Sequence, residues 1–194
     1  MGNIQYCYIL EAYYKDHPGL KQILDVNDSS KHNIRTHLCL NVEYNGQHVL
    51  IPLRKSMGEA NRKFGKIGFS VPSQLKPDAG LDYRYIMIIE EEKYIRYDAP
   101  RIPTSQQKII ADNYDTIERE ALEYIKSYSK VAKKSRVDKT ARFRASSLIN
   151  FDKELKISQT EDTVEQIDTK NEIIEEVAAT SEVIEEAESS KSEE

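Results

Sequence analysis

The sequence has few of the residues on which common metal and disulfide sites depend. It contains two cysteines, Cys7 and Cys39, among 194 residues, and no Cys-x-x-Cys pair. Both lie in apolar, strand-like stretches, so we expect buried thiols in a reducing compartment rather than a disulfide. No His-Glu-x-x-His motif occurs, and His32 and His37 have no acidic or sulfur partner at ligand spacing. The sequence therefore predicts no metal site.

Other motifs with a known chemistry are missing as well. There is no glycine-rich loop of the kind that cradles phosphates, and no Gly-x-Ser-x-Gly elbow for acyl transfer. The first residues have neither the charged region nor the apolar stretch of a signal peptide, and no apolar run is long enough to span a membrane. We expect a cytoplasmic protein with no cofactor and no membrane partner.

Charge is distributed very unevenly along the chain. Residues 158–194 contain thirteen acidic side chains and two lysines, which leaves 26 basic and 20 acidic side chains in residues 1–157. The net charge is therefore about −11 in the last segment and about +6 in the rest. This division predicts a basic domain, residues 1–157, and a disordered acidic tail, residues 158–194. A basic surface favours polyanions such as nucleic acid or anionic lipid.

A β-hairpin is the strongest local prediction. Residues 37–56 read HLCLNVEYNGQHVLIPLRKS, and Asn45-Gly46 is typical of a two-residue type I′ turn. Alternation in the first strand predicts that one set of side chains faces the core and the other faces solvent. Leu38, Leu40 and Val42 form one set, and Cys39, Asn41 and Glu43 form the other. Pro52, which has no N–H donor, predicts a strand end or edge.

The remaining elements predict an α+β domain. Strands are expected at residues 4–10, at 67–71 and in the apolar run that ends residues 80–90, which we expect to pair with the hairpin. A long helix is expected at 105–134 and a short one at 146–155. The long helix follows Pro103, has Ser105 as its candidate N-cap, and carries one apolar stripe. That stripe consists of Ile110, Tyr114, Ile117, Ala121, Ile125, Tyr128 and Ala132. We predict a compact, curved, mostly antiparallel sheet with one long and one short helix packed on it.

Cations, a hydroxyl and tyrosines flank the hairpin and form the candidate site. The site comprises Tyr13 and Tyr14, then Lys31, His32 and Arg35 before the hairpin, Arg54, Lys55 and Ser56 after it, and Arg62, Lys63 and Lys66 further on. Arg35 and Lys55 are each about ten residues from the turn, so strand pairing predicts that they lie at the same end of the ladder. Both cationic clusters are therefore expected in one basic groove.

Such a groove suits cleavage of RNA by its own 2′-hydroxyl. That reaction needs a base, an acid and fixed cations that stabilise the pentavalent phosphorane, and it needs no cofactor. Arginine clamps phosphate oxygens with two donors, and tyrosine rings stack on unpaired bases. A purely structural interpretation stays open beside this one. Charged strand ends are commonly only solvated, Tyr13 is of a type common in cores, and Ser56 is a suitable cap for the next segment.

Three stretches resemble the ToxN/AbiQ family of endoribonuclease toxins from type III toxin–antitoxin and phage-abortive systems. They are LNVEYNGQHVLIPLRKS at residues 40–56, GLDYRYIMII at 80–89, and the helix at 106–130 with its Tyr-x-x-Ile rhythm. The resemblance implies metal-independent cleavage of mRNA that leaves a 2′,3′-cyclic phosphate and a 5′-hydroxyl. It also implies inhibition by a small pseudoknot antitoxin RNA bound in the same groove, a possible ring-shaped RNA–protein assembly, and no DNA partner.

Position by position, the resemblance gives roles to four residues. Arg35 matches a basic residue before the first hairpin strand, and Tyr13 lies near an N-terminal site tyrosine. Relatives carry Thr or Ser directly after Pro-Leu, where this chain has Arg54 and Lys55 before Ser56. Lys55 and Ser56 are therefore both candidates for the reacting position, with Arg35 orienting the phosphate and Tyr13 moving protons. The alternative is a non-catalytic RNA-binding or regulatory module that uses the same basic groove.

Overall fold

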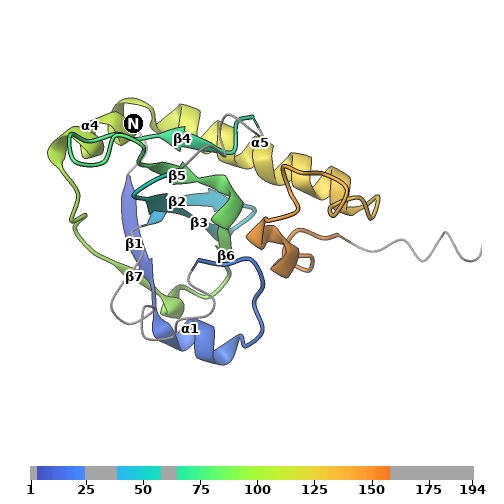
Figure 1. The fold of residues 1–194 in the computed structure, drawn as a ribbon. Helices are drawn as coiled ribbons and strands as arrows, with labels where there is room; N and C mark the ends of the chain where they lie inside the picture. Colours follow the sequence, from blue (N-terminus) through green and yellow to red (C-terminus); the bar gives the residue numbers. More distant parts are fainter. Residues whose placement is uncertain (1–3, 25–38, 58–64, 158–194) are drawn as a thin grey trace, which may run out of the picture. The chain divides into compact units, whose positions relative to one another are not determined.

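A seven-stranded antiparallel sheet is the centre of the computed structural model, which describes residues 4–24, 39–57 and 65–157 (Figure 1). Its strand order is β4-β5-β3-β2-β1-β7, and β6 pairs with β3. The strands are β1 Gln5–Ile9, β2 Cys39–Tyr44, β3 Gln47–Arg54, β4 Gly68–Ser70, β5 Gly80–Asp82, β6 Met87–Ile89 and β7 Ile95–Tyr97. The predicted α+β class with a mostly antiparallel sheet is confirmed.

The hairpin forms as predicted, with β2 and β3 joined through Asn45 and Gly46. Tyr44 pairs with Gln47 across the turn, and the φ angles of Asn45 and Gly46 are 53° and 78°. Positive φ at both central residues is the mark of a type I′ turn, whose twist matches that of the flanking strands.

The prediction that one face of β2 is wet is wrong at Cys39 and Asn41. Their exposed fractions are 1% and 7%, and only Glu43 of that set is exposed. Elements pack on both faces of the sheet here, so alternation along β2 does not separate a wet face from a dry one. Cys39 pairs with Cys7 of β1 in the sheet ladder, and both thiols are buried, as predicted. Burial raises the pKa of Cys7 to about 12 and raises that of Cys39 as well.

Pro52 lies inside β3 rather than at its end. On one side of β3, Pro52 pairs with Cys39 of β2. On the other side of β3 the partner strand changes. Pairing with β6 ends at Leu50 of β3, and pairing with β5 begins at Leu53 of β3. Proline is tolerated because the ladder on that side is already interrupted at its position. The apolar run that ends residues 80–90 forms β6, which pairs with β3 of the hairpin as predicted. β5 and a 3-10 turn at Tyr83–Tyr85 (η1) precede it.

The predicted long helix is two helices, α4 (Thr104–Asp112) and α5 (Tyr114–Ala132). Between them Asn113 has φ −123° and ψ 15°, and its side-chain amide donates to the carbonyl oxygen of Ile109 at 2.8 Å. An amide that bonds the preceding turn in this way competes with continuation of the helix. Most of the predicted stripe is nevertheless buried, namely Ile110, Ile117, Ala121, Ile125 and Tyr128.

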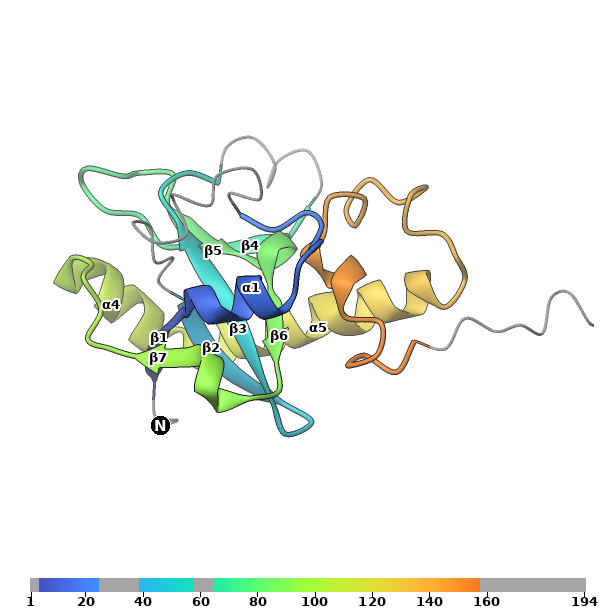
Figure 2. The same cartoon turned by 90° about the horizontal axis from the view of Figure 1, so that it is seen from below.

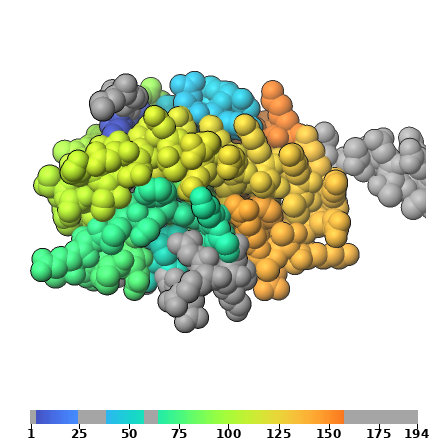
Figure 3. Space-filling view, turned by 90° about the horizontal axis from the view of Figure 1, so that it is seen from above, coloured from blue at the N-terminus to red at the C-terminus, as the bar shows by residue number. Residues whose placement is uncertain are grey.

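Helices lie on opposite sides of the sheet. Helix α1 (Glu11–Asp16) covers one side, and α4 and α5 lie on the other, as Figures 1 and 2 show. In Figure 3, α4 and α5 cross the surface, and residues 133–157 lie around the right-hand end of α5. A further 3-10 turn, η2, spans Glu92–Tyr94, and η3 at Ser147–Asn150 takes the place of the short helix predicted at 146–155. Among the described residues, none of the helices has the length and apolar character needed to cross a membrane.

Candidate functional site

Asp82 is the centre of the candidate site at the end of β3. Its side chain is fully buried at the end of β5, and it accepts hydrogen bonds from two arginines. Arg54 Nη1 lies 2.9 Å from Asp82 Oδ2. Arg84 binds both carboxylate oxygens, with Nε 3.0 Å from Oδ1 and Nη2 2.7 Å from Oδ2. Two positive charges on one buried negative charge leave this group with a net positive charge.

The ring of Tyr85 holds the two guanidinium groups in place. The Cζ atoms of Arg54 and Arg84 lie 5.0 Å and 5.4 Å from its centroid, within the range of cation–π contacts. Burial is the largest single influence on Arg84 and opposes its charge, but the hydrogen bonds and charge of Asp82, with smaller contributions from Tyr85 and Tyr124, together raise the pKa of Arg84. Ser147 of η3 donates to the carbonyl oxygen of Arg84 at 3.0 Å, which ties this turn to the C-terminal part of the domain.

Lys55 and Ser56 are exposed between two anchored residues. On one side Arg54 pairs with Gly80 of β5. On the other side the buried Met57 donates its backbone N–H to the carbonyl oxygen of Asp78 at 2.7 Å. The two candidates for the reacting position are therefore presented to solvent on a short segment that is fixed at both ends.

Lys66 lies beside α5. Its side chain is 80% exposed, and its Nζ atom lies 2.8 Å from Glu120 Oε1. Arg142 donates to the carbonyl oxygen of Lys66 at 2.8 Å and stacks on Tyr124. Neither residue contacts the Asp82 group through a hydrogen bond or ion pair that we find in the described part of the chain.

Tyr13 lies in a different pocket from the one beside β3. It is 5% exposed in α1, stacks on His17 with the ring centroids 4.3 Å apart, and meets Tyr94 edge-on. Burial, together with Glu154 and Tyr94, raises the pKa of its hydroxyl to about 12. Its neighbour Tyr14 lines the small pocket that includes Pro52 and Tyr85 of the β3 region. Of the two adjacent tyrosines, Tyr14 lies closer to the candidate site.

Five of the predicted site residues lie outside the described residues. They are Lys31, His32, Arg35, Arg62 and Lys63. The predicted proximity of Arg35 and Lys55 therefore stays a prediction. In the described part of the ladder, Cys39 at the start of β2 pairs with Pro52. Pro52 is two residues before the end of β3 at Arg54.

Asp82, Arg84 and Tyr85 were not among the residues predicted from the sequence. Asp82 is 28 positions from Arg54, and no local pattern indicates that the two meet. One signal was present: an acidic residue inside an apolar run such as GLDYRYIMII must find a cationic partner if the run is buried. Arg84, two residues on, is one such partner.

The arrangement is suited to binding a phosphate group. The Arg54 side chain is 31% exposed, and of its five N–H donors we find one bonded, to Asp82, in the part of the chain that the structure describes. Exposed Lys55 adds a further positive charge to the same segment. Within the described ranges, no group of three His, Cys, Asp or Glu side chains is placed to hold a metal ion.

Comparisons with known proteins give no relative from which a function is transferable. No family model matches the chain, and searches of curated proteins and of solved structures return no match either. The functional argument therefore depends on the residues and geometry of this chain.

Proposed function

We propose that this protein is a metal-independent endoribonuclease, a toxin of the type III toxin–antitoxin kind, with its active site at the end of β3. Arg54, held by Asp82 and Tyr85 beside exposed Lys55 and Ser56, is the observation that carries the proposal. A guanidinium that is fixed before the substrate arrives does not have to reorient when charge develops in the transition state, so no free energy is spent on its reorganisation.

The reaction consists of one displacement at phosphorus. The 2′-oxygen forms a bond to the neighbouring phosphorus and passes its proton to a water molecule. The bond to the 5′-oxygen breaks, and that oxygen takes a proton from water. The products are a 2′,3′-cyclic phosphate and a 5′-hydroxyl. Arg54 and Lys55 bind the non-bridging oxygens, and Ser56 orients a proton near the reacting oxygens.

The partner that restrains this activity is, in the proposal, a small structured RNA. The same cations that hold a substrate phosphate bind the phosphates of a folded RNA, so an antitoxin RNA in this groove inhibits by occupying it. Assembly of several protein–RNA units into a closed ring is part of the same proposal.

Cleavage by single-residue variants tests the proposal. Full-length protein is incubated with mixed transcripts in the presence of a chelator, and fragment ends are analysed for cyclic phosphate. We expect the Lys55→Ala and Ser56→Ala variants each to cut at least about 100-fold more slowly, the usual effect of losing one catalytic group. Their thermal unfolding should stay unchanged, because both side chains are exposed.

Lys108→Ala is the matched control, since Lys108 is exposed on α4 and bonded to Asp112. It should cut at the unmodified rate. A substrate with 2′-deoxyribose at the cleavage site should bind and stay intact, because it lacks the attacking oxygen. If the unmodified protein and all variants bind RNA but leave it uncut, the nuclease proposal is overturned and the protein is a non-catalytic RNA-binding module.

A further inference from the structure

A second pocket lies at the opposite end of the hairpin from Lys55. Its volume is about 710 Å³, and it is lined by Gln5, Asn41, Glu43, Gly46, Gln47, His48, Tyr114, Asp115 and Glu118. His48 and Arg54 are six residues apart on β3, which is about 20 Å along a strand. This pocket is therefore separate from the proposed nuclease site.

The pocket is acidic. Glu43, Asp115 and Glu118 line it, and no lysine or arginine does. In the part of the chain that the structure describes, we find none of the three in an ion pair. Burial raises the pKa of Tyr114, and Glu118 and Asp115 raise it further, as expected beside negative charge. RNA phosphates are repelled from such a pocket and cations are attracted.

Asn41 provides an independent indication of a ligand with N–H donors. It is 7% exposed, and its Nδ2 atom lies 3.0 Å from Gln5 Oε1, 3.3 Å from His48 Nδ1 and 3.4 Å from the Tyr97 hydroxyl. Among the residues that the structure describes, its Oδ1 atom has no hydrogen-bond partner. A buried acceptor left in this way costs about 1–3 kcal/mol, which a donor from a ligand recovers.

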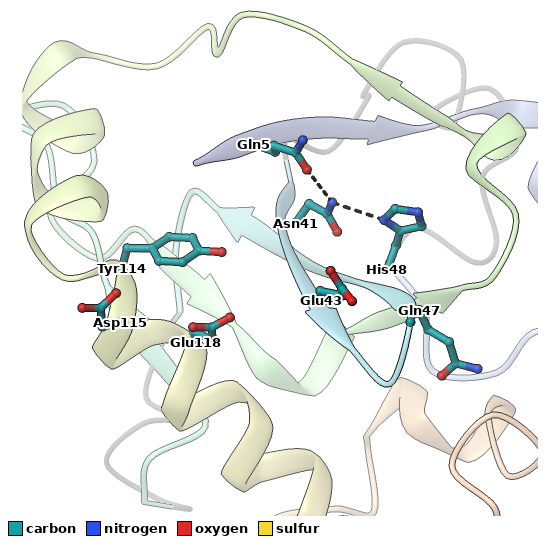
Figure 4. Close-up of a pocket in the computed structure, with 9 residues that line it drawn as sticks. Gln5, Asn41, Glu43, Gln47, His48, Tyr114, Asp115 and Glu118 are labelled. Atoms are coloured by element: carbon teal, nitrogen blue, oxygen red, sulfur yellow. Dashed lines mark hydrogen bonds between the residues drawn. The ribbon is translucent and has the colours of Figure 1, made fainter. Parts of the chain in front are cut away.

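Figure 4 shows how these groups face one another. Asn41 and Glu43 project from β2 into the same space, and Tyr114 and Glu118 point toward them from α5. Gln47 points away from this space. Acceptors therefore lie on two sides of the pocket, and the Tyr114 ring offers a face for a cation.

We propose that this pocket binds an organic cation with several N–H donors. Its volume lies within the range of sites for small organic ligands and is far larger than a bare metal ion needs. A chain of ammonium groups or a guanidinium satisfies the carboxylates at both walls and supplies the donor that Asn41 Oδ1 lacks. Polyamines and arginine side chains share this chemistry.

Calorimetric titration of the full chain, without RNA, tests the proposal with two probes. Spermidine presents ammonium groups on a flexible chain, and N-acetyl-arginine amide presents the guanidinium of a peptide side chain. We expect saturable binding of one of them at a single site, and the tighter probe identifies the source. Side-chain amide signals of Asn41 should shift in an NMR titration with that probe. Saturation of neither probe would overturn the proposal.

Matched charge variants distinguish binding in the pocket from non-specific attraction of a cation to an acidic protein. The Glu43→Gln, Glu118→Gln double variant should bind at least about tenfold more weakly. The control pair, Glu92→Gln and Glu123→Gln, removes the same charge from exposed residues that do not line the pocket and should change affinity less than about twofold. Equal losses in both pairs, or complete displacement by Mg²⁺ at matched ionic strength, would show only non-specific attraction. RNA cleavage should stay unchanged in both pairs.

Discussion

Asp82 is a fully buried carboxylate, and the charges that compensate it come from Arg54 and Arg84. A buried ion needs both opposite charge and hydrogen bonds, because transfer from water costs several kcal/mol. Asp82 has both, with Arg84 bound to its two oxygens. The same contacts hold Arg54 for substrate, so folding stability and the proposed phosphate site depend on one residue.

Replacement of Asp82 by Asn should therefore be severe. The shape is conserved, but two guanidinium groups lose their counter-charge, and we expect the free energy of unfolding to fall by about 3 kcal/mol. Urea denaturation measures this loss. Asp78→Asn is the control, because its side chain is exposed, and it should change stability by less than about 0.5 kcal/mol. Equal stability of both variants would show that the ion pairs do not hold the site.

At the scale of elements, β5 fixes the end of β3 through a close packing that only glycine permits. A Cβ atom on Gly80 would lie 2.6 Å from the Phe69 carbonyl oxygen and 2.8 Å from Met57 Cγ. Met57 is the buried anchor that follows Lys55 and Ser56. The position of the proposed catalytic segment thus depends on the absence of a side chain on the neighbouring strand.

Gly80→Ala should destabilise the fold and displace Met57 together. We expect a loss of about 1–3 kcal/mol, typical of overpacking, and a fall in RNA cleavage beyond what the unfolded fraction explains. Gly46→Ala is the comparison, because its Cβ would meet nothing within 4 Å and only its φ of 78° is unfavourable. It should lower stability by about 1 kcal/mol and leave cleavage by the folded protein intact. If both variants changed RNA cleavage by the folded protein to the same extent, Met57 would not be the residue that positions Lys55 and Ser56.

Elements with local causes were predictable from the sequence, and those with distant causes were not. The hairpin depends on Asn45-Gly46, and its ladder formed as predicted. The break at Asn113 was missed because a single amide turning back on Ile109 leaves the apolar stripe unchanged. β5 was missed because its pairing with β3 depends on tertiary contacts, among them the one between Asp82 and Arg54.

The candidate site was predictable in its cations and not in its geometry. Arg54, Lys55 and Ser56 stand at a strand end that the hairpin pattern locates. The pairing of Arg54 with Asp82 depends on how β5 docks on β3, which no local pattern encodes. The choice between Tyr13 and Tyr14 depends on the direction of each side chain on α1, and adjacent helical residues point different ways.

Across the whole domain, the core holds weakly acidic groups in their neutral form. Burial raises the pKa values of Cys7, Tyr13 and Tyr124 to about 12, from ordinary values of 9.0 for the thiol and 10.0 for the phenols. These residues come from β1, α1 and α5, so the effect spans both sides of the sheet. Ionisation of any of them is easier in the unfolded chain than in the folded one.

The free energy of unfolding of the domain should therefore fall as the pH rises above 9. A raised pKa means that the folded state keeps a proton that the unfolded state releases, so this stability is complete below pH 9 and is lost as pH rises toward 12. At pH 10.5 the Cys7 thiol alone should lower the free energy of unfolding by about 2 kcal/mol. Urea denaturation at pH 7.5, 9.0 and 10.5 measures the slope. Cys7→Ala should be less stable at pH 7.5 yet show a flatter slope, and an unchanged slope would exclude the thiol as its source.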